Sequence, residues 1–201
     1  MAVKGNKKKE APAKDFKAVL WASADKLRAQ MDAAEYKHLV LGLIFLKYIS
    51  DTFVEQQQKV LKMVSDPDSD YYLGDDPNDH QEALEDRDYY TQENVFWVPS
   101  EARWEFINNK AKVPDKFKDG QLIDEALVAI ENENSTLRGK LDKRFGAAQL
   151  EPGCMGELLD LISTIGFGEG RNSADVLGEV YEYFLGQFAR AEGKNAGSFY
   201  T

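Results

Sequence analysis

Apolar residues recur at helical spacing along most of this chain, and they gather into segments that polar breaks separate. The most apolar segment runs from residue 35 to about residue 64. The positions that keep the helical spacing there are Val40, Leu43, Ile44, Ile49, Phe53 and Val60, while Leu39, Leu41, Phe45, Leu46 and Tyr48 fill the other faces. A helix that is apolar all round is expected to be enclosed by protein. We therefore predict a long central helix here, with Phe45 in its core.

Five shorter segments keep the same spacing and are predicted helices. They are residues 15–31, a segment capped by Ser100 that reaches residue 107, residues 122–130, residues 158–165 and residues 173–190. Glycines follow the fourth of these at Gly166, Gly168 and Gly170, and glycine is the residue that most often ends a helix. This series of amphipathic helices predicts a helical bundle.

The polar breaks carry turn signals. Residues 66–90 are acidic and contain Pro67, Gly74 and Pro77, so we predict a loop. Residues 94–98 are apolar and stop at Pro99, which allows a short extended piece. No alternating strand pattern and no internal repeat occurs elsewhere. The fold class is therefore predicted as mainly α, an irregular helical bundle around a long central apolar helix, with at most a short β element near residues 94–98.

The composition is that of a globular protein. A chain of 201 residues can bury one sizeable core or form two small domains, and 43% hydrophobic with 30% charged residues is ordinary for a soluble protein. The longest apolar run, residues 39–46, falls far short of the roughly 20 residues that span a membrane. Residues 1–14 are lysine-rich and poor in apolar groups, so they are predicted to be a disordered basic tail and not a secretory signal. The single cysteine, Cys154, excludes an internal disulfide and fits a reducing cytoplasm.

The net charge of −10 argues against a free-standing nucleic-acid binder, because DNA is itself polyanionic. The charge is uneven, however. Acidic residues gather between residues 66 and 88, whereas lysines and arginines gather in residues 110–118 and 138–144. Within the second basic cluster, Lys140, Lys143 and Arg144 are candidates for contacts with DNA phosphates. The alternative, that they form a solvated face, stays open.

Several stretches resemble one protein family in their amino-acid sequence and in their order along the chain. They read W-x-x-A-D-x-L-R from Trp21, L-G-L-I-F-L-K-Y-I-S-D from Leu41, V-P-S-E-A-R-W-E-F from Val98, I-E-N-E-N-S-T-L-R-G-K-L-D-K-R-F from Ile130 and D-V-L-G-E-V-Y-E-Y-F-L-G-Q-F-A from Asp175. This series is similar to the N-terminal helical region of the modification subunits (HsdM) of type I restriction-modification systems. The resemblance covers nearly all of the chain after about residue 16.

The resemblance implies a site-specific DNA adenine methyltransferase that uses S-adenosylmethionine in a prokaryotic cytoplasm. The implied partners are a specificity subunit, a second modification subunit, a restriction subunit and double-stranded DNA. Residues 15–190 would be the helical N-terminal domain, which docks on these partners and helps the complex to engage DNA. Residues 191–201 would be a linker into a catalytic methyltransferase domain that this chain does not contain.

The family's catalytic signature is missing from these residues. The resemblance implies that Gly197, Phe199, Tyr200 and Thr201 match the start of a G-x-F-Y-T-P motif that helps to hold the methionine end of the cofactor. The N-P-P-(F/Y) tetrad, which orients a flipped adenine for transfer, does not occur. We therefore expect no catalytic residue here and no activity or cofactor binding by this segment alone.

Other candidate sites fail on spacing. Asp66, Asp68 and Asp70 sit at calcium-loop positions, but Tyr71 stands where that loop needs glycine. His38 and His80 are the only imidazoles, and His38 is expected to be structural, so no metal site is predicted.

A second interpretation comes from another class of protein. The chain could be a stand-alone, non-enzymatic helical adaptor that binds other proteins through a bundle surface. A reading frame that continues past Thr201 through T-P and an N-P-P motif would favour the methyltransferase, and a stop codon there would favour the adaptor.

Overall fold

The computed structural model describes residues 21, 33–111, 120–148 and 153–167, and residues 175, 177–179, 182–183, 185–187 and 189–190. Its helices are α2 (Ala33–Ser65), α3 (Pro77–Glu85), α4 (Asp88–Thr91), α5 (Trp104–Ala111), α6 (Gln121–Glu133) and α7 (Cys154–Ile162), with single 3-10 turns at η2 (Ser100–Ala102) and η3 (Ser135–Leu137). No strand occurs among the described residues, so the mainly α prediction is confirmed.

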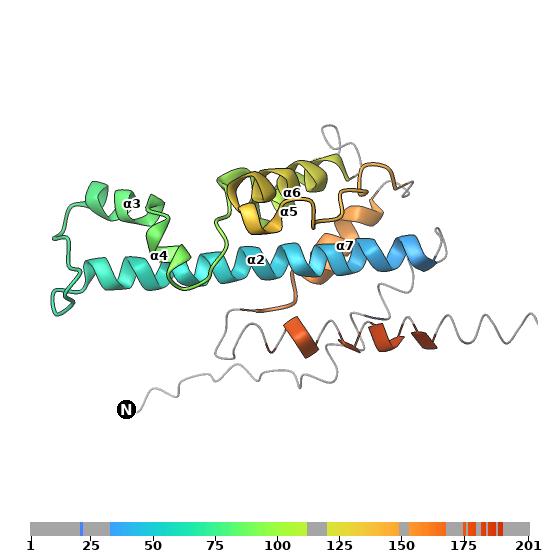
Figure 1. Ribbon diagram of the computed structural model, residues 1–201, viewed down its shortest axis with the longest axis horizontal. Coiled ribbons are helices and arrows are strands. Elements are labelled where there is room, and N and C mark those ends of the chain that lie inside the picture. Colours follow the sequence, from blue (N-terminus) through green and yellow to red (C-terminus); the bar gives the residue numbers. More distant parts are fainter. Residues whose placement is uncertain are drawn as a thin grey trace, which may run out of the picture.

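The helix α2 is the axis of the molecule. It has 33 residues and is therefore about 50 Å long. Figure 1 shows it along the whole length of the bundle, with α5 and α6 on one side and the helical pieces of residues 175–190 on the other. Leu43, Ile44, Leu46, Ile49 and Phe53 are all 0% exposed. The predicted central helix is confirmed, although it begins two residues earlier than expected.

Phe45 departs from its prediction. It is only partly buried, packed against the edge of the core and stacked near Tyr48 at 6.3 Å between ring centroids. Its neighbours Ile44 and Leu46 are fully buried in the core, whereas Phe45 lines an open groove. Continuous apolar sequence therefore does not mean enclosure at every position.

A single tryptophan joins three helices at the centre of the bundle. The Trp104 backbone N–H donates to Ser50 Oγ of α2 at 2.7 Å, and its indole Nε1–H donates to Ser163 Oγ at 2.8 Å, just after α7. The apolar positions of α6, namely Ile123, Ala126, Leu127 and Ile130, close the core from the same side, as predicted from their spacing. These contacts fix α5, α6 and α7 against the middle of α2.

The predicted loop over residues 66–90 is wrong, because it contains α3 and α4. Pro77 is the first residue of α3, where its missing N–H costs nothing and its fixed φ favours the helix. Asp76 caps α3 by accepting a hydrogen bond from the Asn78 N–H at 2.9 Å. Proline and aspartate mark the start of a helix here, although the same residues are also common in loops.

Two predicted helix boundaries are also wrong. The Ser100 hydroxyl donates to Glu101 and caps nothing, so η2 forms first and α5 begins only at Trp104. Helix α7 ends at Ile162, before Gly166, because the hydroxyls of Ser163 and Thr164 bond back to carbonyls of the last turn. Local hydroxyl groups end this helix in place of the expected glycines.

The segment over residues 94–98 is irregular. The Trp97 N–H donates to the Asn134 side chain at 3.0 Å, and Asn134 returns a bond to the Trp97 carbonyl at 2.9 Å, so a side chain takes the place of a strand partner. The described residues between 175 and 190 are all helical, as expected. Trp21 is helical and packs on the core, while the rest of residues 15–31, the tail 1–14 and the linker 191–201 lie outside the described residues.

A buried ion pair ties the end of the described core to α2. The Lys47 ammonium pairs with the Asp51 carboxylate one turn later, and Lys47 is only 7% exposed. Asp51 also accepts a hydrogen bond from the Phe167 N–H at 3.3 Å. The pair therefore fixes the place where the chain leaves α7.

Candidate functional site

The basic cluster predicted to meet DNA lies on the loop of residues 138–145, which follows α6 and η3. Glu131, on the last turn of α6, is 8% exposed and faces this loop from below. Its carboxylate accepts the Leu141 N–H at 2.8 Å and the Lys143 ammonium at 2.5 Å. Burial raises the pKa of Glu131, but the hydrogen bonds from Lys143 and Leu141 outweigh it and leave this pKa below its ordinary value. The charge of Lys143 is thus already paired with a carboxylate of the protein itself.

Arg144 also has a carboxylate partner. It binds Asp142 in a two-pronged contact, with Nε to Oδ1 at 2.7 Å and a terminal nitrogen to Oδ2 at 2.5 Å. The hydrogen bond from Arg144 is the main reason that the pKa of Asp142 is lowered. His38 Nδ1 lies 3.6 Å from the same carboxylate, so the N-terminal part of α2 joins this charged cluster.

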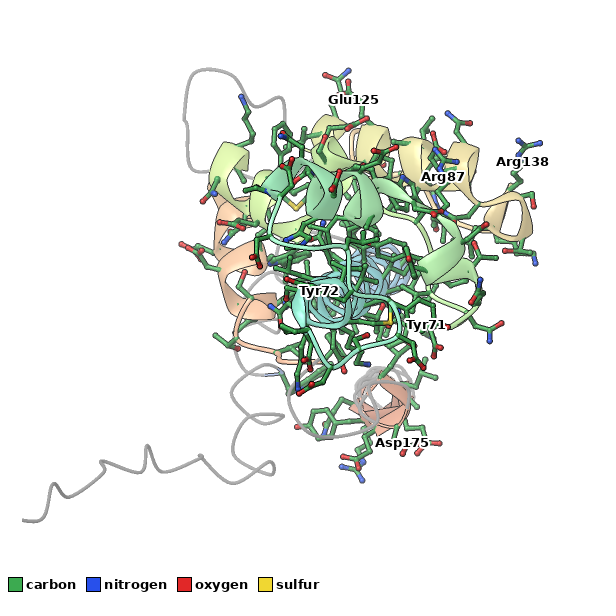
Figure 2. All side chains as sticks on the ribbon, turned by 90° about the vertical axis from the view of Figure 1, so that its left-hand side faces the viewer. Tyr71, Tyr72, Arg87, Glu125, Arg138 and Asp175 are labelled. Carbon is green, nitrogen blue, oxygen red and sulfur yellow. The ribbon has the colours of Figure 1, made fainter. Side chains whose placement is uncertain are left out.

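Lys140 differs from its two neighbours. It is exposed, and it forms no ion pair with any residue that the structure describes. Arg138 is exposed as well, and Figure 2 shows it at the periphery of the molecule, pointing outward. Of the three candidates, Lys140 therefore offers the charge that is most available to an outside anion.

The loop is held in place by contacts that the sequence analysis missed. The Asp124 carboxylate accepts the Phe145 N–H at 3.0 Å and the Gly146 N–H at 2.8 Å. Phe145 is 1% exposed and packs under Gly42 of α2, where an added Cβ would lie 2.9 Å from the ring. Asp124 and Glu131 both lie on α6, seven residues apart, so they share a face, and that spacing was the available signal.

A groove of about 970 Å³ opens beside this loop. Its walls come from the N-terminal part of α2, from α6 and its following loop, and from residues 177–185. Most of the lining side chains are apolar: Leu41, Phe45, Leu127, Leu137, Leu141, Leu177 and Leu185. Polar groups stand among them at Lys37, His38, Lys140, Asp142 and Glu182. The groove suits an apolar occupant with polar edges.

The cofactor candidates Gly197, Phe199, Tyr200 and Thr201 lie outside the described residues, as do Lys112, Lys116 and Lys118 of the other basic cluster. Lys110 is described, and its ammonium lies 5.5 Å from the centre of the Phe106 ring. The described part of the chain holds no group of three or more potential metal ligands. Among the described residues, no helix combines the length and the apolar character that a membrane span requires.

Comparison with known proteins assigns the family. The HsdM N-terminal domain family matches residues 16–162, and the N-6 DNA Methylase family matches residues 172–201. The first match covers most of the chain, so this chain belongs to the HsdM N-terminal domain family. The resemblance expected from the sequence is confirmed.

Relatives agree with this assignment. The type I restriction enzyme MjaIX methylase subunit of Methanocaldococcus jannaschii is 36% identical over 93% of this chain and 33% of its own length. The type I restriction enzyme HindI methylase subunit of Haemophilus influenzae is 39% identical over 52% of this chain and 27% of its own length. The chain thus spans about a third of such relatives.

A solved structure supports the fold. The type I restriction-modification system methyltransferase subunit from Streptococcus thermophilus superposes with a TM-score of 0.59 over 88% of this chain and 39% of that one. At 22% identity, this likeness establishes the helical arrangement alone.

Proposed function

We propose that this chain is the N-terminal domain of the modification subunit of a type I restriction-modification system, and that the whole subunit methylates adenine in DNA with S-adenosylmethionine. The observation that carries the proposal is the order of the two family matches. The HsdM N-terminal domain family ends at residue 162 and the N-6 DNA Methylase family begins at residue 172. A stand-alone adaptor is not expected to be followed directly by a sequence that matches a methylase family.

The proposed partners are a specificity subunit, a second modification subunit, a restriction subunit and double-stranded DNA. Relatives named as type I restriction enzyme methylase subunits, from an archaeon and from bacteria, support an assembly of this kind and a prokaryotic cytoplasm. The domain itself has a rigid core and a structured basic loop, which suit docking and DNA positioning more than chemistry.

The first test concerns the reaction. The full-length subunit, purified with its specificity subunit, is incubated with DNA and S-adenosylmethionine that carries a labelled methyl group. We expect label on adenine with the complex and none with the 201-residue chain alone, which lacks the N-P-P tetrad. The proposal would be contradicted if the complex of the full-length subunit and its specificity subunit put no label on adenine. Transfer of the labelled methyl group by the 201-residue chain alone would contradict it as well.

The second test concerns the basic loop. Lys140 is exposed and free of ion pairs with described residues, whereas Lys143 and Arg144 already face Glu131 and Asp142. We expect Lys140→Ala to weaken DNA binding by the full complex about equally for cognate and non-cognate duplexes. The slope of log affinity against log salt should fall by about 1, since one phosphate contact is lost.

Lys143→Ala and Arg144→Ala should each change the salt slope less than Lys140→Ala, because their charges are already balanced within the protein. Lys62→Ala is the matched control, since it removes the same charge from an exposed position near the far end of α2. If the salt dependence of DNA binding has the same slope for Lys140→Ala, Lys62→Ala and the parent, the loop makes no phosphate contact and is simply a solvated surface.

A further inference from the structure

The groove beside the basic loop leaves apolar side chains without a complete covering. Leu185 is 38% exposed and Phe45 is partly buried, and both line the groove. Leu141 and Leu177, which also line it, are half-buried, whereas Leu41, Leu127 and Leu137 are buried. The four side chains that remain partly open share one cavity, and apolar area left open to water favours a cover.

The two families that match this chain meet at the groove. Leu41, Phe45 and Leu127 belong to the region that matches the HsdM N-terminal domain. Leu177 and Leu185, on the opposite wall, belong to the region that matches N-6 DNA Methylase. A groove built from both regions lies at a boundary between domains, where ligand and docking sites are common.

We propose that the groove is the docking site of the methyltransferase domain of the same subunit, through an apolar segment that follows residue 201 in the full-length protein. This inference rests on the proposed function. The chain spans only 33% of its M. jannaschii relative, so most of such a subunit lies outside the structure. One wall of the groove already belongs to the region that matches N-6 DNA Methylase, so the rest of that domain is the natural candidate to cover it.

Covalent attachment favours this occupant over a separate partner. A segment tethered by a short linker reaches an effective concentration on the order of millimolar, far above that of a free subunit in the cell. Charged residues of both signs also line the groove, Lys37 from α2 and Glu182 from residues 177–185. The segment should therefore present leucine-like side chains to the centre of the groove and polar groups of both signs at its borders.

The test is photo-crosslinking in the full-length subunit. Phe45 is replaced by p-benzoylphenylalanine, which keeps an aromatic ring at the groove wall. A second variant carries the same residue at Leu185, whose exposure makes the substitution tolerable. Phe106 is the matched control, because it is a 37% exposed phenylalanine on α5 that lies outside the groove lining. Mixing isotopically heavy and light copies distinguishes bonds within a chain from bonds between chains.

We expect positions 45 and 185 to form crosslinks within one chain to residues beyond 201, at several times the yield of position 106. Crosslinks to a second copy or to an added specificity subunit would overturn the proposal, and so would yields no higher than that of the control. Methylation measured on the parent subunit with its specificity subunit separates the two proposals. Methylation without the intrachain crosslink refutes the docking site alone, whereas absence of methylation refutes the proposed function.

Discussion

The two halves of α2 meet different surroundings. From Tyr36 to Phe53 the helix packs into the main core with residues of α5, α6 and α7, and its inward side chains are almost fully buried. From Val54 to Ser65 it has α3 and α4 on one side only, with a small cluster of Val60, Val64 and Ala83. One continuous helix thus joins a tightly packed core to a thinly packed arm.

The arm is held mainly by local polar contacts. The Leu73 N–H donates to the Val64 carbonyl at 3.0 Å, and His80 Nε2 bonds to the Gly74 carbonyl at 2.8 Å. Its outer face leaves Val54 at 37% and Leu61 at 42% exposure. Regions with little buried apolar area open at lower free energy than the core. The comparison teaches that helix length does not measure stability, because tertiary packing supplies most of it.

The largest expected effect is in the enclosed half. Ile44 is 0% exposed, so Ile44→Ala should lower the free energy of unfolding by roughly 2–5 kcal/mol through lost burial and a residual cavity. Val64→Ala, at an equally buried position of the arm, removes only two methyl groups and should cost about 1.6 kcal/mol. Urea unfolding of both variants measures the difference.

Val54→Ala, at an exposed position between these two sites, serves as the control and should change stability by less than about 0.5 kcal/mol. Losses that are equal per carbon atom removed, about three for Ile44→Ala and about two for Val64→Ala, would show that the arm is packed as firmly as the core, and the contrast between the two halves would fail.

A smaller effect is expected at the basic loop. Glu131→Gln removes the charge that Lys143 faces in a nearly buried position, so it should cost roughly 1–3 kcal/mol at neutral pH. Because the pKa of Glu131 is lowered on folding, its contribution is present above the ordinary value of 4.5 and is lost as the pH falls below it. The measurement is stability against pH for parent and variant.

The difference between the two curves isolates Glu131 from the other carboxylates. We expect that difference to be constant near neutral pH and to shrink below about pH 4.5, as protonation makes the parent resemble the variant. Asp142→Asn gives a comparison, since the pKa of Asp142 is also lowered but by an exposed arginine. A difference that grows at low pH would mean that the pKa of Glu131 is raised.

The smallest effect concerns the cap of α3. Asp76→Ala removes a hydrogen bond at the start of this helix and should destabilise it by about 0.5–2 kcal/mol. Since the arm opens locally, the loss should appear as faster amide hydrogen exchange in α3, with little change in the core of α2. Asp79→Ala, three residues after Asp76 in the first turn of α3, controls for the charge. Faster exchange throughout α2 would show that arm and core unfold together.

The sequence predicted the core better than the arm, for physical reasons. Burial on all sides leaves a continuous apolar pattern, so α2 and α6 could be recognised from Ile44 or Ile130 and their neighbours. The arm owes its structure to capping and short-range hydrogen bonds of Asp76 and Pro77, whose side chains are equally common in loops. The prediction that Phe45 lies in the core was wrong for a third reason. Phe45 lines a groove that is built from segments far apart in the sequence, so its own surroundings cannot be read from its neighbours along the chain.

The candidate site was predicted only in part. The basic character of Lys140, Lys143 and Arg144 is visible in the sequence, but the ion pair that holds Lys143 is formed with Glu131 on another element. The pairing depends on how α6 and the loop pack, and no spacing rule along the chain gives that geometry. The loop's contact with DNA stays a prediction.

The length of α2 has a mechanical consequence. A continuous helix of 33 residues bends only gently, so a tilt at its groove end would be carried to the acidic arm at the other end. A tilt of about 5° at the groove would carry the far tip through about 3 Å, since about 24 residues with a rise of about 1.5 Å each separate Leu41 from Ser65. A change in how α2 sits at the groove would therefore be largest at the arm.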